Sequence, residues 1–168
     1  MARQEADAVP VETETHQVSA MARRAVAGLD GAEGTVGVRI VTDALAGTDP
    51  RRVERIPTNL VADALRHGAP PVTVEVDVEK DRGGDGPVVR VRDHGPGFPP
   101  DLLTVLTPSG PQRFRTGCGS AGTGLGLGLG LGLAIAFGQA RLFGARLTFR
   151  NHPDGGAEAT LRLTGAGA

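Results

Sequence analysis

The first residues that could do chemistry share one face of a predicted helix. Asn59 and Asp63 lie four positions apart, and Arg66 and His67 follow on the same side. Oxygens from Asn59 and Asp63 could reach one hard cation such as Mg²⁺, which prefers oxygen ligands. Arg66 and His67 could then contact phosphate oxygens beside it. The competing interpretation of this cluster is a solvated helix face, as on most charged helices.

A second group of residues follows the end of a predicted strand. Asp93, Gly95 and Gly97 form an Asp-x-Gly-x-Gly pattern. The Asp93 carboxylate could be aimed at a donor group of a ligand, and the glycines would let the chain bend and the ligand lie against the backbone. A plain turn rich in Asp, Gly and Pro is the alternative for this stretch.

After Gly122 and Thr123, Gly and Leu alternate for ten residues up to Leu133, before the pattern becomes helical near Ala134. A glycine run that leads into a helix can place backbone N–H groups near a phosphate. The run does not fit the Walker pattern, because no Lys-Ser/Thr follows it, and no βαβ unit surrounds it. Such strict alternation is also typical of a low-complexity expansion.

The elements that must position these residues follow from hydrophobic periodicity. The helix with the polar face is expected to start at Pro50, after a capping residue, and to end at His67 before Gly68, with a kink or restart at Pro57. Alternating or apolar runs predict strands, and a second helix and a long binding loop lie between them. The strands are expected at 35–41, 72–78, 88–91, 145–150 and 157–163, the second helix at 133–143 and the loop at about 99–131.

This order of elements predicts an α+β fold. Strands grouped in hairpins with helices on one face indicate a two-layer sandwich and not a doubly wound parallel sheet. Residues 1–30 are expected to form a disordered or loosely helical leader, with a short amphipathic helix at 18–29, and residues 31–168 to form one domain.

The composition narrows the class of function. The net charge of −1 and the presence of only 5 Phe, with no Tyr or Trp, argue against a nucleic-acid partner. The single Cys118 cannot form an internal disulfide, which favours the cytoplasm. The sequence contains no run of 18 or more apolar residues, so we expect no membrane segment in this chain.

Together these motifs resemble the ATP-binding catalytic domain of sensor histidine kinases, in the superfamily shared with gyrase, heat-shock protein 90 and MutL. Residues Asn59-Leu-Val-Ala-Asp63-Ala-Leu-Arg-His67 are similar to the asparagine box, and Asp93-x-Gly95-x-Gly97 matches the first glycine box. Arg113-Phe114-Arg115-Thr116-Gly117 resembles the phenylalanine box, and the run that opens at Gly122 and closes at Ile135 resembles the second glycine box. The likeness covers about 36–163 and implies a Bergerat-type sandwich with a nucleotide lid.

The resemblance also implies roles for individual residues. Asp93 would accept a hydrogen bond from the adenine amino group, and Asn59 and Asp63 would serve in catalysis by facing Mg²⁺ and the phosphates. Arg66 and His67 would contact phosphate or ribose oxygens, and Phe114 would anchor the lid. The remaining nucleotide-binding positions implied by the resemblance are Gly95, Gly97, Gly122, Thr123, Gly124, Leu125, Gly126 and Leu127.

The implied activity is transfer of the γ-phosphoryl group of Mg-ATP to a histidine on another segment or chain, within a two-component phosphorelay. The implied partners are ATP, a phosphoacceptor histidine domain and a response regulator. His16 is not followed by the acidic residue and proline typical of the phosphoacceptor site, so it is interpreted as a tail residue.

Two departures from the family pattern leave alternatives open. Asp63 stands where the family usually has Asn, and six residues, about Gly128–Leu133, exceed the usual length of the second glycine box. The alternatives are a stand-alone serine kinase of the anti-sigma-factor type and a degenerate nucleotide-binding module that acts through protein contacts. The serine kinases usually carry Glu at the position of Asn59 and lack the Arg-Phe-Arg element.

Overall fold

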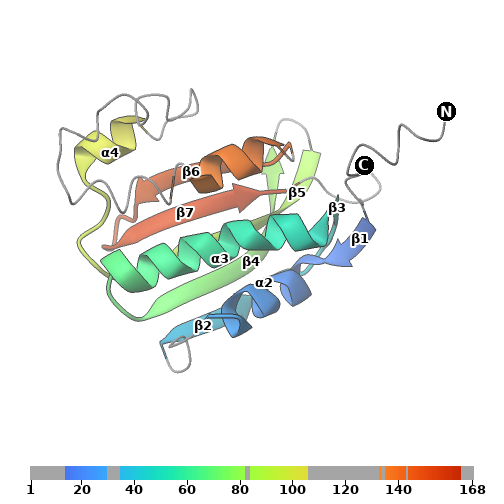
Figure 1. Cartoon of the computed structure of the whole chain (residues 1–168), viewed down its shortest axis with the longest axis horizontal. Helices are drawn as coiled ribbons and strands as arrows, with labels where there is room; N and C mark the ends of the chain where they lie inside the picture. The colour runs from blue at the N-terminus through green and yellow to red at the C-terminus, as the bar shows by residue number, and fades with distance from the viewer. Residues whose placement is uncertain are drawn as a thin grey trace.

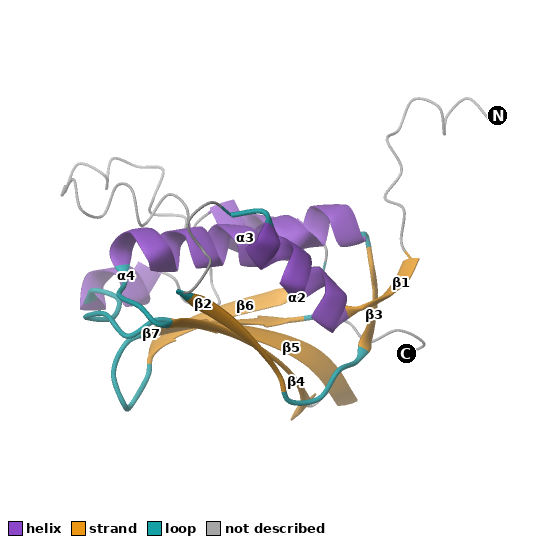
Figure 2. Ribbon diagram, turned by 90° about the horizontal axis from the view of Figure 1, so that it is seen from below, coloured by secondary structure: helices purple, strands orange, loops and turns teal. Residues whose placement is uncertain are grey.

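The computed structural model describes residues 14–29, 35–81, 84–105, 133, 135–142 and 144–163. It is a two-layer α+β sandwich, in which the helices cover one face of a five-stranded sheet (Figures 1 and 2). The strand order is β2-β4-β5-β7-β6; β2 runs parallel to β4, and the other neighbours are antiparallel. The predicted fold class is therefore confirmed, including the mixed and mostly antiparallel sheet.

The elements follow one another in an order close to the predicted one. The helices are α2 (Val18–Ala27), α3 (Pro50–His67) and α4 (Pro100–Val105), with a further helical segment at 135–142. The strands of the main sheet are β2 (Val36–Ile40), β4 (Val72–Asp81), β5 (Gly84–Arg92), β6 (Arg146–Asn151) and β7 (Ala157–Arg162). A separate two-stranded sheet pairs β1 (Glu14–Gln17) with β3 (Leu45–Thr48).

Helix α3 carries the whole predicted polar face and has a well-defined start. The side chain of Asp49 accepts hydrogen bonds from the backbone N–H groups of Arg51 and Arg52, which have no partner inside the helix. The apolar stripe packs on the sheet: Val53, Ile56, Leu60 and Val61 are buried. The helix continues through Pro57, so the expected restart there is not observed.

The β4–β5 hairpin explains why the sheet has one covered and one open face. Val72, Val74 and Val76 point into the core, and the residues between them, Thr73 and Glu75, are polar and lie on the other face. There, Arg90 of β5 forms an ion pair with Glu75 at 2.9 Å. Both strands are longer than the predicted 72–78 and 88–91 because the hairpin continues to Asp81 and Gly84.

The expected division of the chain at residue 30 differs from the structure. Helix α2 forms as predicted, but it packs into the main core, where Val18, Met21 and Ala22 are fully buried. Its polar side is tied to the domain as well, because Arg24 forms an ion pair with Glu54 of α3 at 2.8 Å. The apolar side of an amphipathic helix has to be buried somewhere, and here it covers the sheet beside α3.

Two further differences concern short elements. Strands β1 and β3 were not predicted, since four residues are too few to show an alternation. The segment expected as an irregular lid at 99–131 begins with the short helix α4. Most of that segment, and the glycine run within it, lies outside the described residues. None of the described helices is long and apolar enough to cross a lipid bilayer.

The cap of α3 gives a prediction about stability. Replacing Asp49 by Ala should lower the free energy of unfolding by about 1 kcal/mol, because two N–H groups at the start of the helix lose their acceptor. Urea unfolding followed by circular dichroism measures this change. The Asp49→Asn variant is the matched control, since Asn also caps helices, and it should keep most of the wild-type stability. An equal loss in both variants would contradict the capping role.

Candidate nucleotide site

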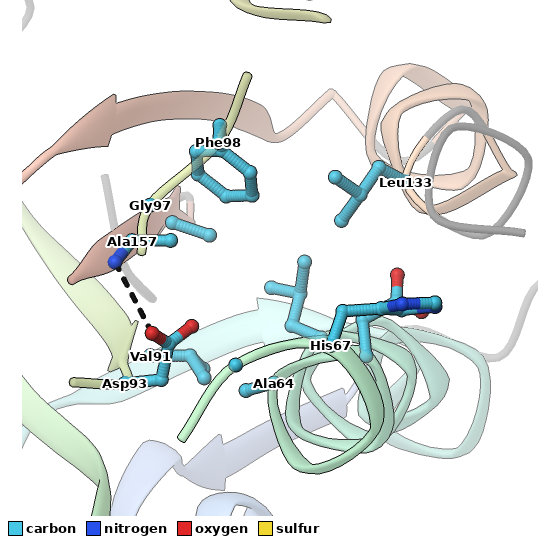
Figure 3. Close-up of a pocket in the computed structure, with 12 residues that line it drawn as sticks. Ala64, His67, Val91, Asp93, Gly97, Phe98, Leu133 and Ala157 are labelled. Atoms are coloured by element: carbon cyan, nitrogen blue, oxygen red, sulfur yellow. Dashed lines mark hydrogen bonds between the residues drawn. The ribbon is translucent and has the colours of Figure 1, made fainter. Parts of the chain in front are cut away.

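Four segments meet around a narrow cavity of about 30 Å³ on the helical side of the sheet. They are the C-terminal end of α3, the end of β5 with the loop after it, the start of β7, and Leu133 before the last helical segment (Figure 3). The cavity is mostly apolar, with two carboxylates and one imidazole among its walls. The lining residues are Leu60, Asp63, Ala64, His67, Gly68, Val91, Asp93, Gly97, Phe98, Leu133, Ala157 and Ala159.

Asp93 is the most firmly held polar residue of this site. It is only 5% exposed and follows directly after β5. Its Oδ1 accepts a hydrogen bond from the backbone N–H of Gly95 at 2.7 Å. It also accepts one from the backbone N–H of Ala157 at 3.3 Å (Figure 3). The structure shows no hydrogen bond to Oδ2 among the described residues. The carboxylate is thus fixed through one oxygen, and the other is available to a donor.

Two glycines allow the chain to close tightly around Asp93. A Cβ atom on Gly68, at the end of α3, would overlap with the Asp93 carboxyl group. A Cβ on Gly156 would overlap with the Asp93 carbonyl oxygen, and Gly156 has a φ of +92°, which side chains rarely adopt. The position of Asp93 therefore depends on the absence of side chains on both of its neighbours.

Asp63 and His67 on α3 each have a buried polar atom without a partner. Asp63 Oδ2 and His67 Nε2 are both buried and make no hydrogen bond in the described structure. Such atoms are uncommon in folded proteins and cost free energy unless a ligand, ion or water satisfies them. Burial raises the pKa of the Asp63 carboxyl to about 6, although the charge of Arg66 acts in the opposite direction.

Asn59 and Asp63 are the residues of this site whose oxygens could bind a divalent cation. The Asn59 Nδ2 group donates to Gln139 Oε1 at 3.3 Å, which orients the carboxamide and leaves its Oδ1 without a partner in the described chain. A cation beside Asp63 would also neutralise its buried carboxylate. No group of three or more His, Cys, Asp or Glu side chains gathers in the described part. The remaining ligands of a cation would therefore be phosphate oxygens and water, as Mg²⁺ prefers.

The structure brings only some of the predicted site residues together. Asp63, His67, Asp93 and Gly97 line the cavity, whereas Asn59, Arg66 and Gly95 lie near it without lining it. The predicted residues of the lid and the second glycine box lie outside the described residues. These are Phe114, Gly122, Thr123, Gly124, Leu125, Gly126 and Leu127.

The predicted set missed most of the apolar wall. Leu60 and Ala64 belong to the apolar stripe of α3, so periodicity could have placed them near the site. Ala157 and Ala159 of β7 carry no sequence signal for a role here, because only the antiparallel pairing of β5 with β7 brings them next to Asp93.

A comparison with known proteins identifies the family. The family model of histidine kinase-, DNA gyrase B- and HSP90-like ATPases matches residues 48–166. The chain belongs to this family. The match begins just before α3 and includes every element that lines the cavity.

The chain is also similar to proteins named as sensors and sensor histidine kinases. The chain is 46% identical over 143 residues to the sensor protein CseC of Streptomyces coelicolor, covering 85% of this chain and 25% of the relative. CseC of Streptomyces avermitilis is 44% identical, covering 80% of this chain and 24% of the relative. The chain thus spans about a quarter of the length of these proteins. The sensor histidine kinase component HK1 of Mycobacterium tuberculosis is 34% identical, with 93% of this chain and 81% of HK1 covered.

Solved structures show the same fold. The ATP-binding domain of PrrB from Mycobacterium tuberculosis superposes with a TM-score of 0.63 at 23% identity, covering 91% of this chain and 97% of that domain. The catalytic domain of the histidine kinase ThkA superposes equally well at 17% identity, with coverages of 92% and 97%. At these identities the likeness establishes the fold alone.

The raised pKa of Asp63 predicts a pH-dependent stability. Its usual pKa of 3.8 applies to the unfolded chain, and the folded chain holds the proton up to a pH of about 6. The stability that this proton provides is present below pH 3.8 and is lost as the pH rises through 6, at a total cost of about 3 kcal/mol. Asp63→Asn avoids this cost. The free energy of unfolding of Asp63→Asn minus that of wild type should therefore increase from pH 4.5 to pH 8.

Urea unfolding at both pH values, with a chelator to exclude bound cations, measures this difference in the free energy of unfolding. An advantage of the Asn variant that is equal at pH 4.5 and pH 8 would show that ionised Asp63 does not destabilise the fold.

Proposed function

We propose that the chain is the ATP-binding catalytic domain of a two-component sensor histidine kinase. In this role it binds ATP and passes the γ-phosphoryl group to a histidine on another segment or chain. The observation that carries the proposal is the buried Asp93, which is fixed through Oδ1 and presents Oδ2 to an apolar cavity. Membership of the ATPase family and the sensor-protein relatives support it.

The base would bind between apolar walls, with Asp93 providing its polar contact. A carboxylate oxygen accepts hydrogen bonds, so Oδ2 suits the exocyclic amino group of adenine and not the carbonyl oxygen that guanine has at this position. Val91, Phe98 and Leu133 would contact the faces and edges of the ring. A cavity of 30 Å³ holds only a few waters, so these walls have to move apart for a purine to enter.

The phosphates would lie toward α3. Asn59 and Asp63 would hold Mg²⁺, which neutralises charge on the phosphate groups. The unpartnered His67 Nε2 and the exposed guanidinium of Arg66 would contact phosphate or ribose oxygens. Asp63 adds a negative charge where the family usually has Asn, so nucleotide binding should depend more strongly on the cation than with Asn there.

Transfer of the phosphoryl group would depend mainly on positioning and neutralisation of charge, as in phosphoryl transfer generally. The phosphoacceptor histidine and a response regulator are the proposed macromolecular partners, and the cytoplasm is the proposed location.

The role of Asp93 can be tested without disturbing its neighbours. Asp93→Asn keeps an oxygen that accepts from Gly95 and Ala157 but turns an amide NH₂ toward the base. We expect wild type to bind Mg-ATP more tightly than Mg-GTP, and Asp93→Asn to lose at least tenfold in ATP affinity at nearly unchanged stability. Isothermal titration calorimetry provides both affinities. Equal ATP affinity of the two proteins would remove the basis for the proposed adenine contact.

The phosphotransfer step has its own test. The chain is incubated with γ-labelled Mg-ATP and a helical hairpin that carries the phosphoacceptor histidine of a sensor kinase, with a His→Ala hairpin as the control. We expect labelling of the hairpin that is lost in acid and retained in base, as a phosphorus–nitrogen bond requires. Acid-stable label on serine would identify a serine kinase instead. Binding of ATP without any transfer would identify a nucleotide-binding module.

A further inference from the structure

The β6–β7 hairpin has a side-chain contact with the Asp93 loop that none of the sequence motifs includes. Asn151 ends β6, and its carboxamide bridges both backbone groups of Phe98. Asn151 Oδ1 accepts from the Phe98 N–H at 2.6 Å, and Asn151 Nδ2 donates to the Phe98 carbonyl oxygen at 3.1 Å. These two hydrogen bonds tie the loop that follows Asp93 to the far edge of the sheet.

The same strand also holds the Phe98 ring. Phe149, two residues before Asn151, meets Phe98 edge to face with ring centroids 5.7 Å apart. Phe149 is in turn stacked near Phe137 of the last helical segment at 6.4 Å. The ring of Phe98 is buried and forms one wall of the cavity (Figure 3). The end of β6 therefore fixes this wall through both its backbone and its side chain.

Gly97 provides a second observation that the Asn151 carboxamide packs against the loop after Asp93. A Cβ atom on Gly97 would lie 2.7 Å from Asn151 Oδ1, closer than real Cβ contacts allow. The φ of Gly97 is +90°, which also favours glycine. The second glycine of the Asp-x-Gly-x-Gly pattern is thus favoured here by its positive φ and by the nearby Asn151 carboxamide, whatever it contributes to a ligand.

We propose that Asn151 is a positioning residue for nucleotide binding, which acts by holding Phe98 as a wall of the base pocket. The inference rests on the proposed function, because the base is expected to lie between Phe98 and Leu133. Without the carboxamide, Phe98 loses two hydrogen-bond partners, and the loop between Asp93 and α4 is free to shift. Nucleotide binding then has to order that loop again, which lowers the affinity.

The test compares Asn151→Ala with wild type by calorimetry at a temperature at which both are fully folded. We expect Asn151→Ala to bind Mg-ATP and Mg-ADP about tenfold more weakly, with the same factor for both because the effect lies at the base and not at the γ-phosphate. Thr148→Ala, on the opposite face of β6, should bind as wild type. Asp49→Ala, which is destabilised far from the pocket, should also keep wild-type affinity and so separates positioning from general stability.

Amide hydrogen exchange, resolved to single residues by NMR, gives a readout that does not need nucleotide. The Phe98 amide should be protected in wild type and in Asn151→Asp, which keeps the acceptor, and should exchange faster in Asn151→Ala. The inference about Asn151 would be overturned if Asn151→Ala bound ATP as tightly as wild type or if its Phe98 amide stayed protected. Either result would leave the proposed function untouched. A wild-type chain that binds neither nucleotide would overturn the proposed function and the inference together.

Discussion

The contact on which the site depends is the packing of the end of β5 against the start of β7. Asp93 donates its N–H to the Ala157 carbonyl oxygen at 3.0 Å and accepts the Ala157 N–H through its side chain. One residue thus uses both backbone and carboxylate to join the loop after β5 to the last hairpin. Gly68 and Gly156 lie so close that no side chain fits between them and Asp93. The Asp93 end of the cavity is therefore built on rigid elements, the neighbouring strands of the sheet.

The α3 end of the cavity has a different character. Its polar atoms lie on α3 and lack partners, and the buried Asp63 carboxyl has a pKa raised to about 6 by its surroundings. This end is unfavourable to the folded protein by itself, and a cation with phosphate groups would relieve that cost. In the proposed function, stability and ligand binding would thus oppose each other at Asp63, as is common at functional sites.

The two layers of the fold provide the walls at these two ends of the cavity. The sheet provides the order β4-β5-β7 that places Val91, Ala157 and Ala159 under the cavity, and α3 lies across it with Leu60 and Ala64 facing down. Helix α2 extends the same core, with Met21 fully buried, so residues well before the family match contribute to the domain. The short sheet of β1 and β3 joins α2 to the start of α3.

The sequence by itself determined most of the helices and strands and the types of polar side chain on the face of α3. Val72, Val74 and Val76 predicted a strand with one buried face, the stretch up to Pro50 predicted the start of α3, and the spacing of Asn59 and Asp63 predicted a shared polar face. These features depend on periodicity and capping, which are local, and the structure confirms them. The fold class also followed, because the order of helices and hairpins leaves few ways to bury the apolar faces.

Only the tertiary structure decided which residues stand next to Asp93 and the loop that follows it. Ala157 and Asn151 are about sixty residues away in the chain, and the pairing of β5 with β7 and of β7 with β6 brings them there. No local pattern marks an alanine or an asparagine at a strand end as part of a site. The sequence likewise does not determine that α2 packs into the main core. Its amphipathic pattern shows that one face must be buried, but it does not show which element covers that face. Local chemistry is encoded in the sequence, whereas the neighbours of each group are set by long-range strand pairing.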